Sequence, residues 1–236
     1  MRLSDFKVLS FDCYGTLIDW ETGLAAALKD RPATLSREQI LMSFARHEAA
    51  QEAETPGMIY SELLARVHRR LTAEWGVAAS TEADRAFGRS VGDWPAFADT
   101  PGALAYLKEH YKLAILSNVD RTSFAAILPR LGVGFDAVYT AEDIGSYKPD
   151  LNNFRYLIAE LGKQGYGRGD ILHVAQSLFH DHAPANAVGL SSAWIDRRRG
   201  AETWGATPPP APGVHWDFRF ASLAELVEAH RREAGA

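Results

Sequence analysis

The chain has 236 residues, of which 47% are hydrophobic, and its formal net charge is −5. This length is enough for one full domain and a smaller insert. The mild acidity, without a long basic run, argues against nucleic acid as a partner, and we expect the one basic cluster, residues 197–199, to be a solvated loop.

Cysteine use and hydropathy predict a cytoplasmic protein. The single cysteine, Cys13, excludes an internal disulfide and agrees with a reducing compartment. The N-terminal residues 1–5 are too polar for the core of a signal peptide. No apolar run reaches the length that spans a membrane, so we expect no membrane partner.

A strand is predicted at the start of the chain, over residues 6–11, which are rich in apolar and aromatic side chains. Asp12 is the first acid after this run, and Gly15 allows a sharp turn behind it. Open α/β sheets bind ligands at the carboxyl ends of their strands. Asp12 is therefore a candidate site residue, although an aspartate at this place also caps helices and turns.

After this turn the pattern is helical for about eighty residues. A short helix is expected at 21–28, and Ser36 with Gln39 forms a capping box that begins a longer one. Pro56 and the glycine after it separate that helix from the next. An all-helical segment placed after the first strand predicts an inserted cap domain.

From residue 95 onward, strands alternate with helices, which is typical of a mostly parallel sheet covered on both faces. We expect a doubly wound α/β core domain over 1–18 and 95–236, with a helical cap domain over 19–94. The expected core strands are 113–116, 137–139, 171–174 and 192–195, and the expected helices are 102–110, 122–128 (ending at Pro129), 152–161 and 222–232.

Reactive side chains follow four of these strands or lie in adjoining loops. They are Asp12, Ser117 with Asn118, Lys148 in a Lys-Pro-Asp loop, and the stretch 176–181. Each alone is typical of a turn or a solvated loop. Because the carboxyl ends of parallel strands share one edge, we expect these side chains to meet.

In this order the motifs resemble those of the haloacid dehalogenase superfamily over residues 6–18 and 95–196. The resemblance implies a Rossmann-like core with a helical cap after the first strand. It also implies that Asp12 is the nucleophile, Ser117 the second-motif hydroxyl, Lys148 the motif lysine and Asp181 the last acid.

Two departures point away from the magnesium-dependent phosphatases of that superfamily. Tyr14 stands where phosphatases carry a second aspartate, which protonates the leaving alkoxide, and a tyrosine is a poor donor for this purpose. Gln176 stands where they carry a metal-binding aspartate, and magnesium favours carboxylate oxygens. We therefore expect no metal and no cofactor.

The first motif instead resembles the Asp-x-Tyr-Gly-Thr of the 2-haloacid dehalogenase branch. That resemblance implies a metal-independent (S)-2-haloacid dehalogenase, in which Asp12 displaces halide and forms an aspartyl ester. Asp181 would orient or deprotonate the water that attacks this ester. Lys148 would hold Asp12 ionised by lowering its pKa.

The expected partner is a small halogenated carboxylate, and a homodimer is left open. Mismatches with the closest dehalogenases are Phe154, where a tyrosine is common, and Gln-Ser-Leu at 176–178, where Ser-Ser-Asn is common. Two roles are open for three aromatic side chains of the predicted cap domain: they line an apolar halide pocket, or they pack in the hydrophobic core. These residues are Trp20, Phe44 and Tyr60. The expected substrate-binding residues are Tyr14, Thr16, Asn118, Arg46, Gln176 and Ser177.

Three alternatives remain at this stage. One is a phosphatase with a weakened magnesium site, and another is a non-catalytic binding protein on the same scaffold. The third is a transition-metal site at His173, His180 and His182, for which no cysteine or carboxylate set completes zinc geometry. Otherwise these histidines are a polar shell around Asp181.

Overall fold

The computed structural model describes residues 1–28 and 31–235. A six-stranded sheet, with all its strand pairs parallel, has the order β3-β2-β1-β4-β5-β6 and confirms the predicted α/β fold. The strands are β1 (Val8–Phe11), β2 (Lys112–Ser117), β3 (Ala137–Thr140), β4 (Ile171–Ala175), β5 (Ser191–Ile195) and β6 (Phe218–Phe220).

Strand β1 lies in the middle of the sheet, where the winding direction reverses. It pairs with β2 on one side and with β4 on the other. The chain builds β2 and β3 outward on the first side and then returns to add β4 on the second. Such a switch point opens a crevice at the carboxyl ends of the strands. Asp12, which follows β1 directly, lies at this point.

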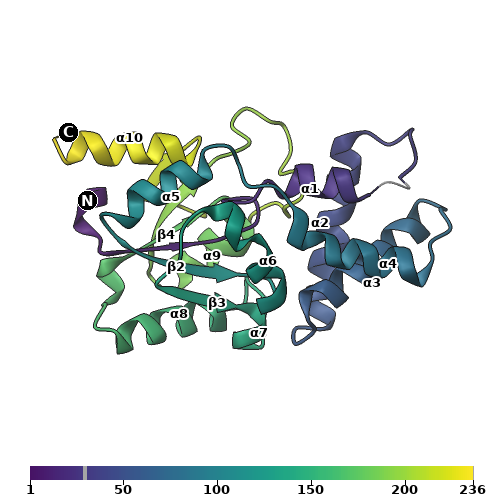
Figure 1. The fold of residues 1–236 in the computed structure, drawn as a ribbon, viewed down its shortest axis with the longest axis horizontal. Helices are drawn as coiled ribbons and strands as arrows, with labels where there is room; N and C mark the ends of the chain where they lie inside the picture. Colours follow the sequence, from purple (N-terminus) through teal and green to yellow (C-terminus); the bar gives the residue numbers. More distant parts are fainter. Residues whose placement is uncertain (29–30, 236) are drawn as a thin grey trace.

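Helices cover both faces of the sheet (Figure 1). Successive side chains of a strand point to opposite faces, and because the strands carry apolar side chains on both, both faces must be buried. Leu9 and Phe11 belong to the cluster on one face, and Val8 belongs to the cluster on the other. The first face carries α5 (Thr100–Lys108), α6 (Arg121–Leu131) and α10 (Leu223–Glu233), and the second carries α8 (Leu151–Lys163) and α9 (Ala183–Ala187).

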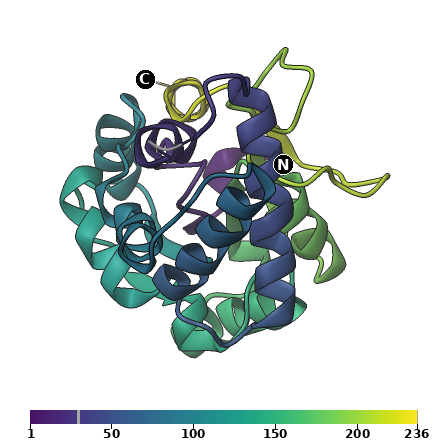
Figure 2. The same ribbon diagram turned by 90° about the vertical axis from the view of Figure 1, so that its right-hand side faces the viewer.

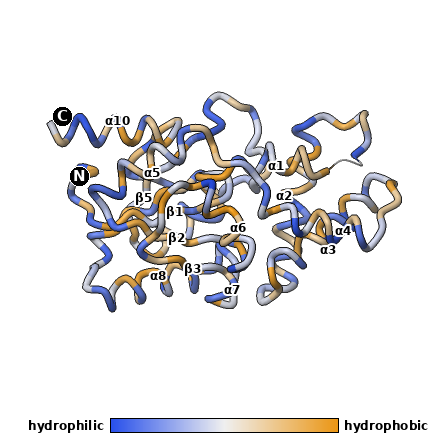
Figure 3. Tube along the Cα trace, viewed as in Figure 1, coloured by the Kyte–Doolittle hydropathy of each residue, from blue (hydrophilic) through white to orange (hydrophobic). Residues whose placement is uncertain are grey.

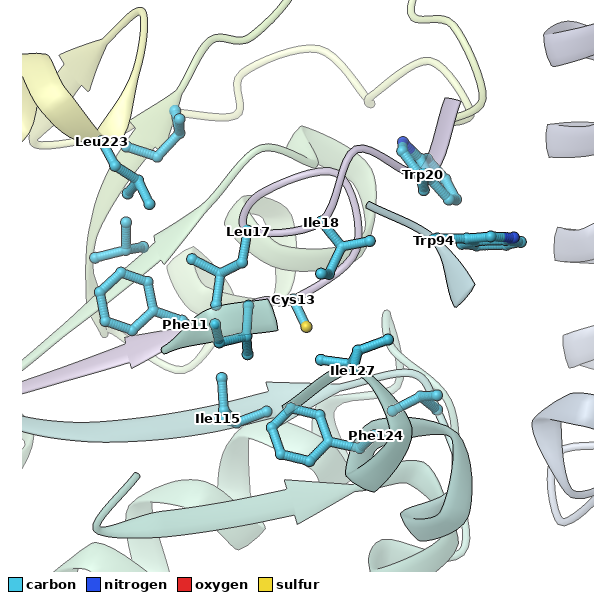
Figure 4. Packing of buried hydrophobic residues seen from close by; sticks show 14 of the residues in the cluster. Phe11, Cys13, Leu17, Ile18, Trp20, Trp94, Ile115, Phe124, Ile127 and Leu223 are labelled. Carbon is cyan, nitrogen blue, oxygen red and sulfur yellow. The ribbon is translucent and has the colours of Figure 1, made fainter. Parts of the chain in front are cut away.

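Close packing on the first face is seen in Figure 4, where Phe11 and Ile115 from the sheet lie near Phe124 and Ile127 of α6. Figure 3 shows apolar segments along the strands, and in α8 apolar and polar residues alternate within each turn. This alternation is the pattern of a helix with one buried side. The core therefore follows from the hydrophobic periodicity that predicted it.

Four helices form a lobe at one end of the sheet, seen from the side in Figure 1 and face-on in Figure 2. The predicted capping box is confirmed, because Ser36 and Gln39 exchange hydrogen bonds of 3.2 and 2.8 Å. The division into a core and a cap domain stays a prediction. The four helices are α1 (Trp20–Ala27), α2 (Arg37–Glu54), α3 (Tyr60–Glu74) and α4 (Thr81–Arg89).

The basic cluster at 197–199 joins the lobe to the sheet, so the expectation of a solvated loop was wrong. The side chains of Arg197 and Arg198 are only 10% and 18% exposed. Arg198 binds Glu21 of α1 at 2.7 Å and Glu38 of α2 at 2.8 Å. Carboxylates from two lobe helices thus bind the Arg198 guanidinium, which the local sequence alone predicted to be exposed to solvent.

The predicted ends of the helices and strands agree with the structure to within two residues, except for the C-terminal end of α6. This helix continues through Pro129 to Leu131, and its C-cap is Gly132, which has a φ of +74°. Ile127 and Leu131 are fully buried, and their packing offsets the one backbone hydrogen bond that a proline loses. No helix in the described ranges is both long and apolar enough to cross a bilayer.

The remaining elements are short and carried no sequence signal of their own. Strand β6 has three residues, and α7 (Ala141–Ile144) lies where a loop was expected. The others are the 3-10 segments Leu3–Asp5, Ser90–Asp93 and Arg168–Asp170 and a π-helical turn at Leu178–His182.

Helices α3 and α4 approach each other closely at Gly88, and this contact is testable. A Cβ added to Gly88 would lie 2.1 Å from the carbonyl oxygen of Ser61, so Gly88→Ala should cost about 1–3 kcal/mol of unfolding free energy. Gly162→Ala in α8 is the matched control, because nothing lies within 4 Å of its added Cβ. The control should gain about 0.5–1 kcal/mol from helix propensity. Urea unfolding measures both, and equal stabilities would contradict the packing described.

Candidate active site

A small cavity of about 30 Å³ lies between the carboxyl edge of the sheet and helices α1, α2 and α3. The structure brings most of the predicted site residues together around it. Eight of them line it: Asp12, Tyr14, Ser117, Asn118, Lys148, Gln176, Ser177 and Asp181. The lining is completed by Trp20, Glu48, Glu52, Tyr60, His180 and Thr207.

The Lys148 ammonium joins the two central carboxylates. Its Nζ atom lies 2.9 Å from Oδ1 of Asp12 and 2.6 Å from Oδ1 of Asp181. It also donates to the carbonyl oxygen of Leu116, at 3.0 Å. A lysine has three N–H donors, so these contacts use all of them.

Asn118 holds the backbone of Lys148 from both sides. The Lys148 N–H donates to Oδ1 of Asn118 at 2.7 Å, and Nδ2 of Asn118 donates to the Lys148 carbonyl at 2.9 Å. These paired bonds fix the loop from which the lysine side chain extends. Asn118 therefore acts on Lys148 rather than on the carboxylate of Asp12.

Thr16 directs its hydroxyl proton at the second oxygen of Asp12. Its Oγ1 accepts the Gln176 N–H at 2.9 Å and donates to Oδ2 of Asp12 at 2.6 Å. The turn that permits this needs Gly15, whose φ is +91°. A Cβ there would lie 3.1 Å from Nε1 of Trp20. Thr16 therefore positions Asp12 and does not line the cavity.

The two carboxylates differ in their electrostatic surroundings. Burial raises the pKa of Asp12, and the Lys148 charge and the Thr16 hydrogen bond only partly oppose it. The predicted effect of Lys148 is thus present, because its charge lowers the pKa of Asp12, but burial outweighs it and the net shift is upward. Burial also acts on Asp181, yet Lys148 and His173 together bring the pKa of Asp181 well below its usual range. The pKa of Lys148 is raised, because the two carboxylates outweigh its own burial.

Asp181 is oriented from behind by His173. Nε2 of His173 lies 3.0 Å from Oδ1 of Asp181, and Nδ1 lies 2.8 Å from the Ser10 hydroxyl. The other carboxylate oxygen, Oδ2, is buried and has no hydrogen-bond partner among the described residues. This oxygen is free to accept a hydrogen bond from a water molecule.

The other two histidines do not contact Asp181 in this way. His182 bonds Ser192 and the carbonyl of Ala175. His180 lines the cavity, and burial lowers its pKa to about 4, so it is neutral near pH 7. Within 1–28 and 31–235 there is no group of three side chains able to hold a metal ion.

The donors near Asp12 do not fit magnesium either. Both oxygens of Asp12 are already bonded, to Lys148 and Thr16. Gln176 offers an amide where a hard cation favours a carboxylate, and its Oε1 lies 3.4 Å from the Thr207 hydroxyl.

Three of the hydroxyl groups that line the cavity differ in their bonding. Those of Tyr14 and Ser117 are buried without a hydrogen-bond partner among the described residues. Burial raises the pKa of Tyr14 further, which makes it a weaker proton donor still. Ser177 instead caps the π-helical turn by accepting the His180 N–H at 2.9 Å.

The structure does not bring Arg46 into the site. Its guanidinium pairs with Glu74 of α3, and its side chain is 62% exposed. Position 46 lies off the stripe of α2 that faces the core, so helical phase excludes it from the cavity. Of the aromatic residues, Trp20 and Tyr60 line the cavity. Phe44 is core instead, packed edge-to-face on Trp20 and Phe87.

Sequence reasoning missed two buried acids of α2, Glu48 and Glu52, which are 3% and 6% exposed. Their signal was present, because 48 and 52 continue the stripe of buried residues at 41 and 45. The Tyr60 hydroxyl donates to Glu48, and Asn118 donates to Glu52 at 3.0 Å. Burial raises the pKa of Glu48 to about 8, and burial with the Glu48 charge raises that of Glu52 well above its usual range.

Comparison with known proteins gives a family and a fold. A family model described as haloacid dehalogenase-like hydrolase matches residues 6–175. No functionally curated protein matches this chain in sequence.

Three solved structures are similar over nearly the whole chain. The L-2-haloacid dehalogenase RSc1362 is 20% identical, with 96% of this chain and 99% of that chain covered and a TM-score of 0.81. The L-2-haloacid dehalogenase from Xanthobacter autotrophicus, with chloropropionic acid covalently bound, is 19% identical, with 96% and 98% covered and a TM-score of 0.76. The putative HAD-hydrolase YfnB from Bacillus subtilis, bound to magnesium, is 18% identical, with 98% and 100% covered and a TM-score of 0.77. At these identities the likeness shows the fold.

Removing the ammonium tests the three-way contact. Lys148→Met leaves two buried carboxylates without their cation, which should cost about 3–5 kcal/mol of unfolding free energy at pH 7. The stranded carboxyl groups then have raised pKa values, so this deficit should shrink as the pH falls and they bind protons.

Lys163→Met is the control, because the Lys163 side chain is 70% exposed and pairs only with its helix neighbour Glu160. Its stability should stay close to that of the parent. A Lys148→Met protein as stable as this control would show that the three-way contact is not formed.

Proposed function

The chain belongs to the haloacid dehalogenase-like hydrolase family, and we propose that it is a hydrolytic dehalogenase that works through an aspartyl ester without a metal. The single observation that carries this is the double anchoring of Asp12. Lys148 and Thr16 hold its two oxygens at the edge of a cavity in which Tyr14 and Gln176 replace the acids of a phosphatase. Such an arrangement suits displacement of a group that leaves unprotonated.

In the first step Asp12 acts as the nucleophile. One carboxylate oxygen attacks the sp³ carbon that carries the halogen, a C–O bond forms, and the halide leaves with the C–X electron pair. Lys148 and Thr16 keep the carboxylate oriented for this attack, and such orientation lowers the barrier. Tyr14 is not required as an acid, because a halide departs as a stable anion.

In the second step water attacks the carbonyl carbon of the aspartyl ester. Asp181 orients this water and accepts its proton, because Lys148 and His173 keep Asp181 ionised and its Oδ2 is unpartnered within the described chain. When the acyl C–O bond breaks, the departing alkoxide takes the proton that Asp181 received from water, which gives the hydroxylated product. The Asp12 carboxylic acid formed in this step then loses its proton to solvent, so both carboxylates are restored.

The substrate class expected from the sequence is the (S)-2-haloacids. The Xanthobacter autotrophicus enzyme, which shares this fold, carries covalently bound chloropropionic acid, and this supports a covalent route here. The runner-up is phosphate ester hydrolysis, favoured by the magnesium bound to the Bacillus subtilis structure. The donor set around Asp12 weighs against it. A binding protein without catalysis is disfavoured by the presence of nucleophile, lysine and final acid in one cavity.

Asp12→Asn should abolish chloride release from 2-chloropropionate and from 2-chloropropionamide. The side-chain carboxamide that replaces the carboxylate at position 12 is not a competent nucleophile. Asp93→Asn is the control, since the Asp93 side chain is 85% exposed. The parent and the control should release chloride equally in EDTA and in magnesium. Phosphate release that requires magnesium, with no chloride released, would contradict the proposal.

Asp181→Asn should stop the reaction after the ester forms, because the attacking water loses its base. We expect a burst of about one equivalent of chloride per enzyme, followed by turnover at least about a hundredfold slower than in the parent. Mass spectrometry of the quenched variant should find the ester on Asp12. A slow steady state without a burst would place Asp181 in the first step instead.

A further inference from the structure

The cavity is acidic, although the expected substrate is an anion. Four carboxyl groups line it, on Asp12, Asp181, Glu48 and Glu52, against one ammonium. No arginine belongs to the described lining, and His180 is neutral near pH 7. The cavity thus lacks the fixed positive charge that a carboxylate ligand favours.

Lys148 does not supply that charge to a substrate. Its three N–H donors are taken by Asp12, Asp181 and Leu116, and its charge is shared between two carboxylates. A substrate carboxylate would add a further acceptor beside Asp12 and Asp181, which already accept from Lys148. Such like-charge juxtaposition is costly in a buried site.

Glu48 and Glu52 present acceptor oxygens where a cation would be needed. One oxygen of each is bonded inside the protein, to Tyr60 and to Asn118. Oε2 of Glu48 has no hydrogen-bond partner among the described residues. Oε2 of Glu52 lies 3.8 Å from Nε2 of His180, which is beyond hydrogen-bonding distance.

A carboxyl group, ionised or protonated, pairs with a carboxamide. Ionised, it accepts from the amide N–H₂, and protonated, it also donates to the amide oxygen. Burial raises the pKa of Glu48 to about 8, so both of its forms exist near neutral pH, and the pKa of Glu52 is raised as well. A substrate carboxylate only accepts hydrogen bonds, so it is complementary to the protonated form alone.

Resting on the halide displacement proposed above, we propose that Glu48 and Glu52 make this enzyme select 2-halocarboxamides over 2-haloacids. The amide keeps the carbonyl group that activates the neighbouring carbon toward displacement. For 2-chloropropionamide, Asp12 forms a C–O bond at carbon 2 while the C–Cl bond breaks and chloride takes the electron pair. Water then cleaves the ester to 2-hydroxypropionamide and the Asp12 carboxylate.

The test compares 2-chloropropionate with 2-chloropropionamide, which have nearly the same shape and differ by one charge. Chloride release by the parent should give a kcat/KM at least about tenfold higher for the amide, equivalent to ~1.4 kcal/mol of discrimination. This comparison needs no variant, so it does not depend on how a substitution folds.

A second experiment tests whether the two glutamates cause the preference for the amide, with the variants Glu48→Gln and Glu52→Gln, alone and combined. Each removes a carboxyl group at almost constant volume, so the amide-to-acid ratio should fall at least about tenfold in the combined variant. Glu54→Gln on the same helix is the control, because the Glu54 side chain is 56% exposed and pairs with Arg70. The control should keep the parent ratio.

The outcomes separate the two proposals. Faster turnover of the acid than of the amide by the parent would overturn this inference and leave the dehalogenase proposal standing. An amide preference that survives in the combined variant would overturn the assignment to Glu48 and Glu52. No chloride from either compound would refute the dehalogenase proposal and, with it, the inference that rests on it.

Discussion

The site depends on one buried ammonium shared between two carboxylates. Lys148 joins Asp12, at the end of β1, to Asp181, beyond the end of β4, so its charge holds together two segments far apart in sequence. Buried charges of one sign are tolerated only when they are paired and hydrogen-bonded, which ties the position of each acid to the lysine. The same contact gives the acids different environments and therefore different roles. Asp181 also receives His173, while Asp12 receives Thr16.

The sheet makes this contact possible, and the helical lobe contributes the rest of the cavity lining. The winding order places the ends of β1, β2 and β4 side by side. Helix α2 then covers this edge with two glutamates, where an arginine was expected. Under the proposals above, the core sets the reacting carboxylate, and a helix whose register follows from its apolar stripe sets the substrate preference. Changes in that one helix can therefore alter specificity without disturbing Asp12.

Most of the fold and the central site residues were predictable, and the failures have physical reasons. Apolar periodicity and strand ends located the sheet, Asp12, Lys148 and Asp181, because local pattern and topology govern them. The prediction that Arg46 lies in the site was wrong because an uncertainty of one or two residues in helical phase moves a side chain to another face of the helix. Glu48 and Glu52 were missed because acids on a helix normally face solvent. Arg198 and Pro129 were misjudged because tertiary partners, absent from local sequence, decide burial and continuation.

The central claim is that Asp12 becomes esterified, and oxygen-18 labelling under single-turnover conditions tests it most directly. Enzyme in excess over 2-chloropropionamide would react in H₂¹⁸O, and mass spectrometry would follow the hydroxylated product and the peptide that contains Asp12. If Asp12 is esterified, ¹⁸O appears in the Asp12 carboxylate and the product is unlabelled, because the product oxygen comes from the aspartate and water attacks the ester carbonyl. Label in the product of that first turnover, with Asp12 unlabelled, would contradict this claim, since water would then have attacked the substrate carbon itself.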